Sequence, residues 1–191
     1  GEYVWKEGLN PGFSSRGWDT KIEYDITAAG LNWNFGADAP LSNDIDFRSV
    51  IAHEIGHSLG WDTTFDNNYD DWGWMYTNYP NGGYYGLTDW DNNLVDGSGN
   101  RASNGGTGIP GNFIQNDNPV FFDGANAVAL YGGLVPIYAP AVFSNGSSLA
   151  HLDESALGNL LMSPFISRGQ TIRTVSELEW AMMKDMGWNI I

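Results

Sequence analysis

The pentapeptide His53-Glu54-Ile55-Gly56-His57 constrains the fold more than any other part of the chain. It reads H-E-x-x-H, and residues four apart on a helix lie one above the other on the same face. Two imidazoles with this spacing can bind one metal ion, and the glutamate beside them can reach a water on that metal. The pentapeptide therefore predicts a helix that carries two metal ligands and a general base.

The third and last histidine of the chain is His151. A catalytic zinc usually takes three protein ligands and leaves one position open for water. We therefore expect His53, His57 and His151 to bind one Zn²⁺, with Glu54 as the general base. A carboxylate is the alternative third ligand, as in sites with two histidines and one glutamate, and the candidates are Asp62, Glu154, Glu177 and Glu179.

The residues around the pentapeptide have the features of an amphipathic helix. Asp44 and Asp46 can cap its start, and Gly60 can end it by adopting the left-handed conformation. The apolar residues predict one buried stripe, which leaves both histidines to face a cleft. The stripe consists of positions 47, 50, 51, 55 and 59.

Other elements are expected on both sides of this helix. Alternation of polar and apolar residues predicts strands over 21–27 and 31–35. A short helix is expected over 124–131, and a capping box from Ser176 to Glu179 begins a last helix that ends at Gly187. Residues 97–111 are Gly, Ser and Asn with almost no large apolar residue, which is typical of a surface loop.

The predicted fold is a single catalytic α+β domain over residues 1–191. An upper lobe, residues 1–60, is expected to hold a small twisted mixed sheet and the zinc helix. Residues 61–191 are expected to form an irregular lower lobe with a long insertion, the third ligand and the C-terminal helix. The cleft then runs between the two lobes.

The formal net charge is −15, and between Arg48 and Arg168 the single basic residue is Arg101. Nucleic acids and anionic membranes select basic surfaces, so we expect neither as a partner. The chain has no cysteine, which excludes disulfides and thiolate ligands. The acidic surface suits solubility outside the cell and the lack of cysteine favours a bacterial exported protein, so we expect a secreted, bacterial monomer. The chain starts at Gly1 rather than Met, and a signal peptide is therefore expected to lie outside this sequence.

A longer pattern joins these motifs. The pentapeptide extends to H-E-x-x-H-x-x-G at Gly60, and a remote histidine is followed by G-N-x-L-M at 158–162. Over residues 30–188 the chain resembles the metzincin metallopeptidases. More narrowly, it resembles the leishmanolysin-like branch and related secreted bacterial peptidases, in which a long insertion displaces the third zinc ligand.

The resemblance implies that the three histidines bind zinc, that Glu54 is the base and that Met162 is the methionine of the Met-turn beneath the metal. The chain departs from the family pattern at Thr63, which stands where many metzincins have their third histidine. The absence of cysteine favours the bacterial relatives. No tyrosine occurs in 163–168, so the resemblance assigns no oxyanion-stabilising residue.

The function expected from these residues is zinc-dependent hydrolysis of peptide bonds in an extended polypeptide, which the strand over 31–35 can bind by strand addition. The alternative is a non-catalytic binding module for glycans, calcium or both, because the chain has 9 Trp, 9 Tyr and 9 Phe among acidic turns. Ca²⁺ is a possible second cofactor. Its candidate ligands are Asp89, Asp91, Asn93 and Asp96.

Overall fold

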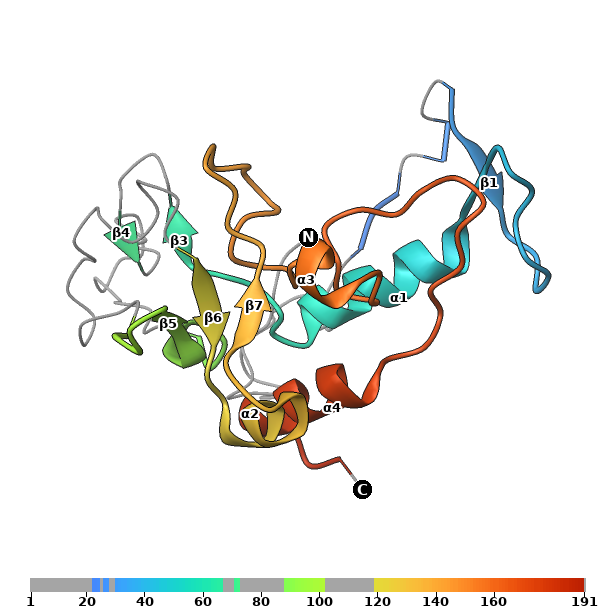
Figure 1. The fold of residues 1–191 in the computed structure, drawn as a ribbon. Helices are drawn as coiled ribbons and strands as arrows, with labels where there is room; N and C mark the ends of the chain where they lie inside the picture. The colour runs from blue at the N-terminus through green and yellow to red at the C-terminus, as the bar shows by residue number, and fades with distance from the viewer. Residues whose placement is uncertain are drawn as a thin grey trace, which may run out of the picture.

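The computed structural model describes residues 22–24, 26–27, 30–66, 71–72, 88–101 and 119–190. Within these ranges the chain forms a small mixed α+β fold with four α-helices and three short sheets (Figure 1). The helices are α1 (Phe47–Ser58), α2 (Ala125–Tyr131), α3 (Glu154–Leu157) and α4 (Glu177–Asp185). The predicted α+β class is confirmed, and no helix in the described part is long and apolar enough to cross a membrane.

The three sheets are short and separate. In parallel pairing, β1 (Asn32–Asn34) lies beside β2 (Asp44–Asp46). The other two sheets are antiparallel: β3 (Phe65–Asp66) with β4 (Asp71–Trp72), and β5 (Leu94–Asp96), β6 (Val120–Phe122) and β7 (Val135–Ile137) in that order. A 3₁₀ turn, η2 (Asp91–Asn93), leads into β5.

The predicted placement of the sheets is wrong in one respect. Among the described residues the β1–β2 pair precedes α1, whereas a three-stranded sheet lies within 61–191, the part that was expected to be irregular. The strand expected over 31–35 is confirmed as β1. Of the strand expected over 21–27, the described residues are irregular. Most of the loop expected over 97–111 lies outside the described residues.

The main core lies between the three-stranded sheet and the two helices α2 and α4, which pack side by side (Figure 1). Met182 of α4 and Met186, which follows the helix, are buried. The carboxylate of Asp185 accepts hydrogen bonds from the backbone N–H groups of Asn126 and Ala127, both at 2.9 Å. Since these N–H groups have no partner within their own helix, α4 caps the start of α2.

Helix α1 begins and ends where the sequence predicts. Asp46 is its N-cap and accepts a hydrogen bond from the backbone N–H of Ser49 at 3.1 Å, and Gly60 follows the helix with a φ of +106°. The predicted buried stripe is wrong at Ile55, which is 46% exposed, and its other members are half-buried. The buried residues of the helix are Ser49 and His57.

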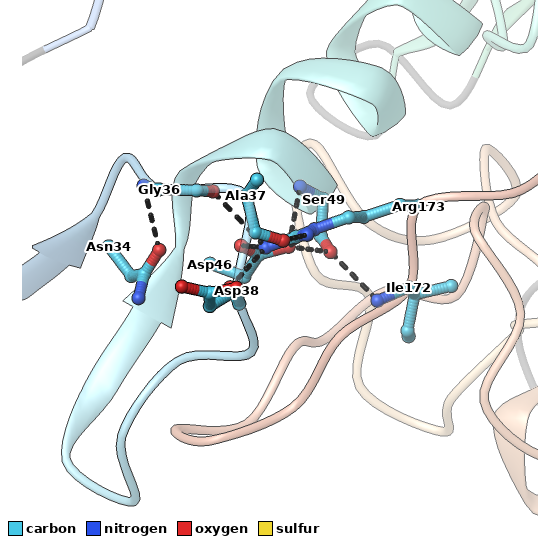
Figure 2. Close-up of polar contacts among 8 residues, drawn as sticks. All are labelled: Asn34, Gly36, Ala37, Asp38, Asp46, Ser49, Ile172 and Arg173. Carbon is cyan, nitrogen blue, oxygen red and sulfur yellow. Dashed lines mark hydrogen bonds and ion pairs between the residues drawn. The ribbon is translucent and has the colours of Figure 1, made fainter.

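The segment after α3 runs along α1, reaches the β1–β2 pair and returns to α4 (Figure 1). Figure 2 shows how it is fixed at the start of α1. The guanidinium of Arg173 binds both carboxylate oxygens of Asp46 at 2.6 and 2.7 Å and donates to the backbone carbonyl of Asp38 at 2.9 Å. Beside Arg173, the N–H of Ile172 donates a hydrogen bond to the Ser49 hydroxyl of α1 at 2.7 Å. The N-terminus of α1 is therefore held from the C-terminal half of the chain.

Candidate metal centre

The structure brings the three histidines of the chain together. Their Nε2 atoms form a triangle with sides of 3.0 Å between His53 and His57, 3.2 Å between His57 and His151 and 3.1 Å between His53 and His151. Three nitrogens on one tetrahedral zinc, with Zn–N distances of about 2.0–2.1 Å, lie about 3.3 Å apart. The triangle therefore has the size that a zinc ion needs.

The opposite nitrogen of each ring is anchored to a backbone carbonyl. The Nδ1–carbonyl pairs are His53 with Leu161 at 2.7 Å, His57 with Trp61 at 2.5 Å and His151 with Ser147 at 2.8 Å. A carbonyl oxygen only accepts, so each Nδ1 carries a hydrogen, and in the neutral form of the ring its Nε2 presents a lone pair. Three lone pairs about 3 Å apart, with no hydrogen between them, repel one another unless a cation lies among them. The donor set thus fits a metal ion.

The two deeply buried imidazoles are held in their neutral form. His57 and His151 are 7% and 3% exposed. Burial, reinforced by the neighbouring His151 and His53 rings, lowers the pKa of His57 to about 3. Burial also lowers the pKa of His151 to about 4. Both rings are therefore neutral near pH 7, which is the form that binds metal.

The loop that carries His151 is fixed by strand-like bonds to the residue after β7. The N–H of Tyr138 donates to the His151 carbonyl at 2.8 Å, and the N–H of Leu149 donates to the Tyr138 carbonyl at 2.9 Å. Leu149 is fully buried with a φ of +67°, and its carbonyl accepts a hydrogen bond from the Trp90 indole at 2.7 Å. A left-handed leucine costs about 1–2 kcal/mol, so the loop conformation that places His151 destabilises the folded state by about this amount.

Met162 lies against the helix of the pentapeptide. It is 1% exposed, and a Cβ added to Gly56 would lie 2.3 Å from its sulfur. Only a glycine therefore lets α1 approach Met162 this closely. The residue before it, Leu161, supplies the carbonyl that anchors His53, so the turn that contains Met162 both supports the helix and orients a candidate ligand.

Glu54 and His53 both line a cavity of about 170 Å³. The rest of its wall is mainly apolar and comes from α1 and from the segment around Met162. These apolar residues are Val50, Leu160, Leu161, Pro164, Phe165, Ile166 and Ile172. The Glu54 carboxylate and the His53 imidazole therefore border the same, mainly apolar cavity.

Two residues near the site make contacts that the sequence did not predict. Tyr24 packs on Phe47 of α1, its hydroxyl is buried without a hydrogen-bond partner, and burial together with the Glu54 carboxylate raises its pKa to about 12. Glu179 was predicted as a helix cap, but it also accepts a hydrogen bond from the Met162 N–H at 2.7 Å. No sequence signal points to Tyr24, whereas the capping box could have drawn attention to Glu179.

The carboxylates considered as alternative third ligands do not join the triangle. In the described part of the chain, the only group of three metal-ligating side chains consists of the three histidines. Asp62 is largely buried, and burial together with the Asp91 carboxylate raises its pKa to about 7. Glu154 begins α3, while Glu177 and Glu179 lie in the first turn of α4. The geometry favours His151 as the third ligand.

The candidate calcium residues are engaged in other hydrogen bonds. The fully buried carboxylate of Asp91 accepts from the Thr63 and Thr64 hydroxyls at 2.8 and 2.6 Å. The Asp96 carboxylate binds the backbone N–H groups of its own turn, and the Asn93 amide donates to the Asp89 carbonyl at 2.7 Å. The calcium hypothesis gains no support from this arrangement.

Comparisons of the chain with models of protein families, with curated proteins and with solved structures found no match. The chemistry of this site is therefore argued from its own residues.

Proposed function

We propose that the protein is a secreted zinc-dependent endopeptidase of metzincin type. The observation that carries the proposal is the triangle of three imidazoles whose Nε2 atoms converge, with Glu54 on the same turn of α1. The acidic composition suits solubility outside the cell. A glycan-binding or calcium-binding module, the alternative from the sequence, gives no reason for three histidines to meet.

His53, His57 and His151 would hold the metal through Nε2. A zinc ion bound there supplies a Lewis acid that polarises the scissile carbonyl and acidifies a water. Glu54 borders the cavity beside His53, where its carboxylate can take a proton from the attacking water and pass it to the leaving amine. The carbonyls behind the Nδ1 atoms keep the three rings in the tautomer and orientation that this task requires.

The apolar cavity supports a polypeptide substrate. Its aliphatic and aromatic wall suits one apolar side chain next to the scissile bond, because burying such a side chain is favourable while burying an unpaired charge is not. In the described part of the chain, β1 pairs with β2 alone, so it is the strand we propose for pairing with an extended substrate. Helical peptides should then be cut more slowly than extended peptides of the same composition.

The test combines metal content with hydrolysis. Purified wild-type protein should contain one zinc per chain and should cleave an unfolded polypeptide. Glu54→Gln should retain the zinc and the fold but lose activity by 10²-fold or more, since it removes the base without changing the ligands. Glu177→Gln, a substitution of an exposed glutamate in α4, is the matched control and should leave activity unchanged.

Hydrolysis that survives Glu54→Gln unchanged would refute the mechanism. A wild-type protein that binds no zinc, even after zinc is added, would refute the proposed metal centre and leave the binding module as the better interpretation.

A further inference from the structure

Glu179 makes one hydrogen bond that helix capping does not require. Its Oε2 accepts from the backbone N–H of Ser176 at 2.7 Å, and its own N–H donates to the Ser176 hydroxyl at 3.2 Å, which completes the capping box. Its Oε1 instead accepts from the N–H of Met162 at 2.7 Å. The side chain is 1% exposed, so both contacts are shielded from water. Because each oxygen faces an N–H donor, the group is arranged as a carboxylate.

The N–H of Met162 and the carbonyl of Leu161 belong to the same peptide unit. That carbonyl accepts the hydrogen on Nδ1 of His53 at 2.7 Å. Resonance joins the two ends of a peptide unit, and a hydrogen bond at one end polarises the other. A carboxylate on the N–H therefore increases the negative charge on the oxygen that faces His53. The buried site strengthens this effect, because the local dielectric constant is low.

We propose that Glu179 is a positioning residue for the metal centre, which acts on His53 through the peptide unit between Leu161 and Met162. In many metal sites a carboxylate binds the far nitrogen of a histidine ligand directly, fixing its tautomer and making it a better donor. Here a peptide unit lies between the two groups. The inference rests on the proposed metal site and not on peptidase activity.

His151 provides an internal reference for this effect. Its Nδ1 lies 2.8 Å from the Ser147 carbonyl, a distance close to that in the His53 pair. The N–H of that peptide unit, on Ser148, donates to the neutral carbonyl of Ser144 at 2.9 Å. His53 and His151 are thus anchored to backbone carbonyls at similar distances. The peptide unit behind His53 is bound by the carboxylate of Glu179, whereas the peptide unit behind His151 is bound by a neutral carbonyl.

The first experiment measures zinc affinity by competition with a chelator. Glu179→Gln has nearly the same size, but one of its two terminal groups is an amide donor that cannot accept from an N–H. We expect its zinc affinity to fall about 10- to 100-fold, the range found when supporting residues of metal ligands are removed. The matched control is Ser176→Ala, which removes the reciprocal cap bond but keeps the carboxylate. Its zinc affinity should stay within about threefold of the wild type.

The second experiment observes the histidine ring nitrogens by ¹⁵N–¹H NMR in the metal-free protein. With three histidines in the chain, their ring signals can be assigned from single substitutions. The Nδ1 proton of His53 should resonate further downfield than that of His151, because its hydrogen bond is stronger. In Glu179→Gln the His53 signal should move upfield, while the His151 signal stays in place.

The outcomes separate this inference from the proposed function. An unchanged His53 signal and unchanged zinc affinity in folded Glu179→Gln would overturn the inference, as would an equal loss of affinity in Ser176→Ala, which indicates a merely structural role. If Glu179→Gln does not fold, the test is the wild-type spectrum alone. A His53 Nδ1 proton that resonates at the same shift as that of His151, or upfield of it, would overturn the inference. A wild-type protein without zinc affinity refutes the proposed function, yet the NMR comparison still tests the effect of Glu179 on His53.

Discussion

The contact between Gly56 and Met162 leads to a quantitative prediction. A Cβ at Gly56 would lie 2.3 Å from the Met162 sulfur, whereas an ordinary contact is about 3.5–4.0 Å. The sulfur must therefore withdraw by more than about 1 Å, into surroundings that leave Met162 only 1% exposed. Overpacking of this kind costs about 1–3 kcal/mol.

The same substitution also removes a glycine from the middle of a helix, which stabilises the folded state by about 1 kcal/mol. We therefore expect Gly56→Ala to lower the free energy of unfolding by about 1 kcal/mol in the wild type, the difference between the two effects. In a Met162→Ala background the overlap disappears, and Gly56→Ala should then raise the free energy of unfolding by up to about 1 kcal/mol.

The assay is urea denaturation of the four proteins of this double-mutant cycle, with a chelator present so that metal affinity does not enter. Gly133→Ala is the control, since a Cβ at Gly133 meets no atom within 4 Å, and it should change stability by less than about 0.5 kcal/mol. The reasoning is refuted if Gly56→Ala has the same effect with and without the Met162 side chain.

Three further predictions concern charge and metal. The metal-free protein should lose stability as the pH falls from 6.5 toward 4, by up to about 1.4 kcal/mol per pH unit for each of His57 and His151. The sign follows because their pKa values, about 3 and about 4, lie below the ordinary value of 6.5, so the unfolded chain takes up protons first. A flat stability profile in urea titrations at pH 7, 6 and 5 would contradict this. Arg173→Met should lower the melting temperature at pH 7. The difference in melting temperature between the variant and the wild type should narrow below pH 3.8, the ordinary pKa of this carboxyl group, because the Arg173 guanidinium lowers the pKa of Asp46. A difference that stays constant down to pH 3 would argue against this prediction. His151→Ala should weaken zinc binding more than 100-fold by chelator competition, since a direct ligand contributes more than its supporting residues; full zinc retention would move the third ligand to a carboxylate.

The sequence predicts the elements whose signals are local. The bounds of α1 and α4 follow from Asp46, Gly60 and the capping box at Ser176, and each of these caps is formed in the structure. The pairing of His53 with His57 needs only the geometry of one helix. For these features, a few neighbouring residues determine the outcome.

Other features depend on contacts that no local pattern encodes. The three strands of the largest described sheet read Leu-Val-Asp, Val-Phe-Phe and Val-Pro-Ile, without the alternation of polar and apolar residues that revealed β1, so this sheet was not predicted. Ile55 was assigned to a buried stripe by its hydropathy, but its side chain is 46% exposed. His151 was expected as the third ligand because it is the remaining histidine of the chain and because of the family resemblance. Its geometry, however, depends on the left-handed Leu149, which no residue preference predicts.

The triangle of imidazoles also bears on how the chain holds itself together. His57 and His151 lie 94 positions apart and meet at 3.2 Å, in a chain that has no cysteine. A metal ion bound between them would be a cross-link between the first and the last thirds of the protein, comparable to a disulfide in its effect on the unfolded chain. Unlike a disulfide, this link can be removed by a chelator and restored by free zinc, and its strength is set by the zinc concentration. Supply of one ion would then govern both the lifetime of the fold and its chemistry.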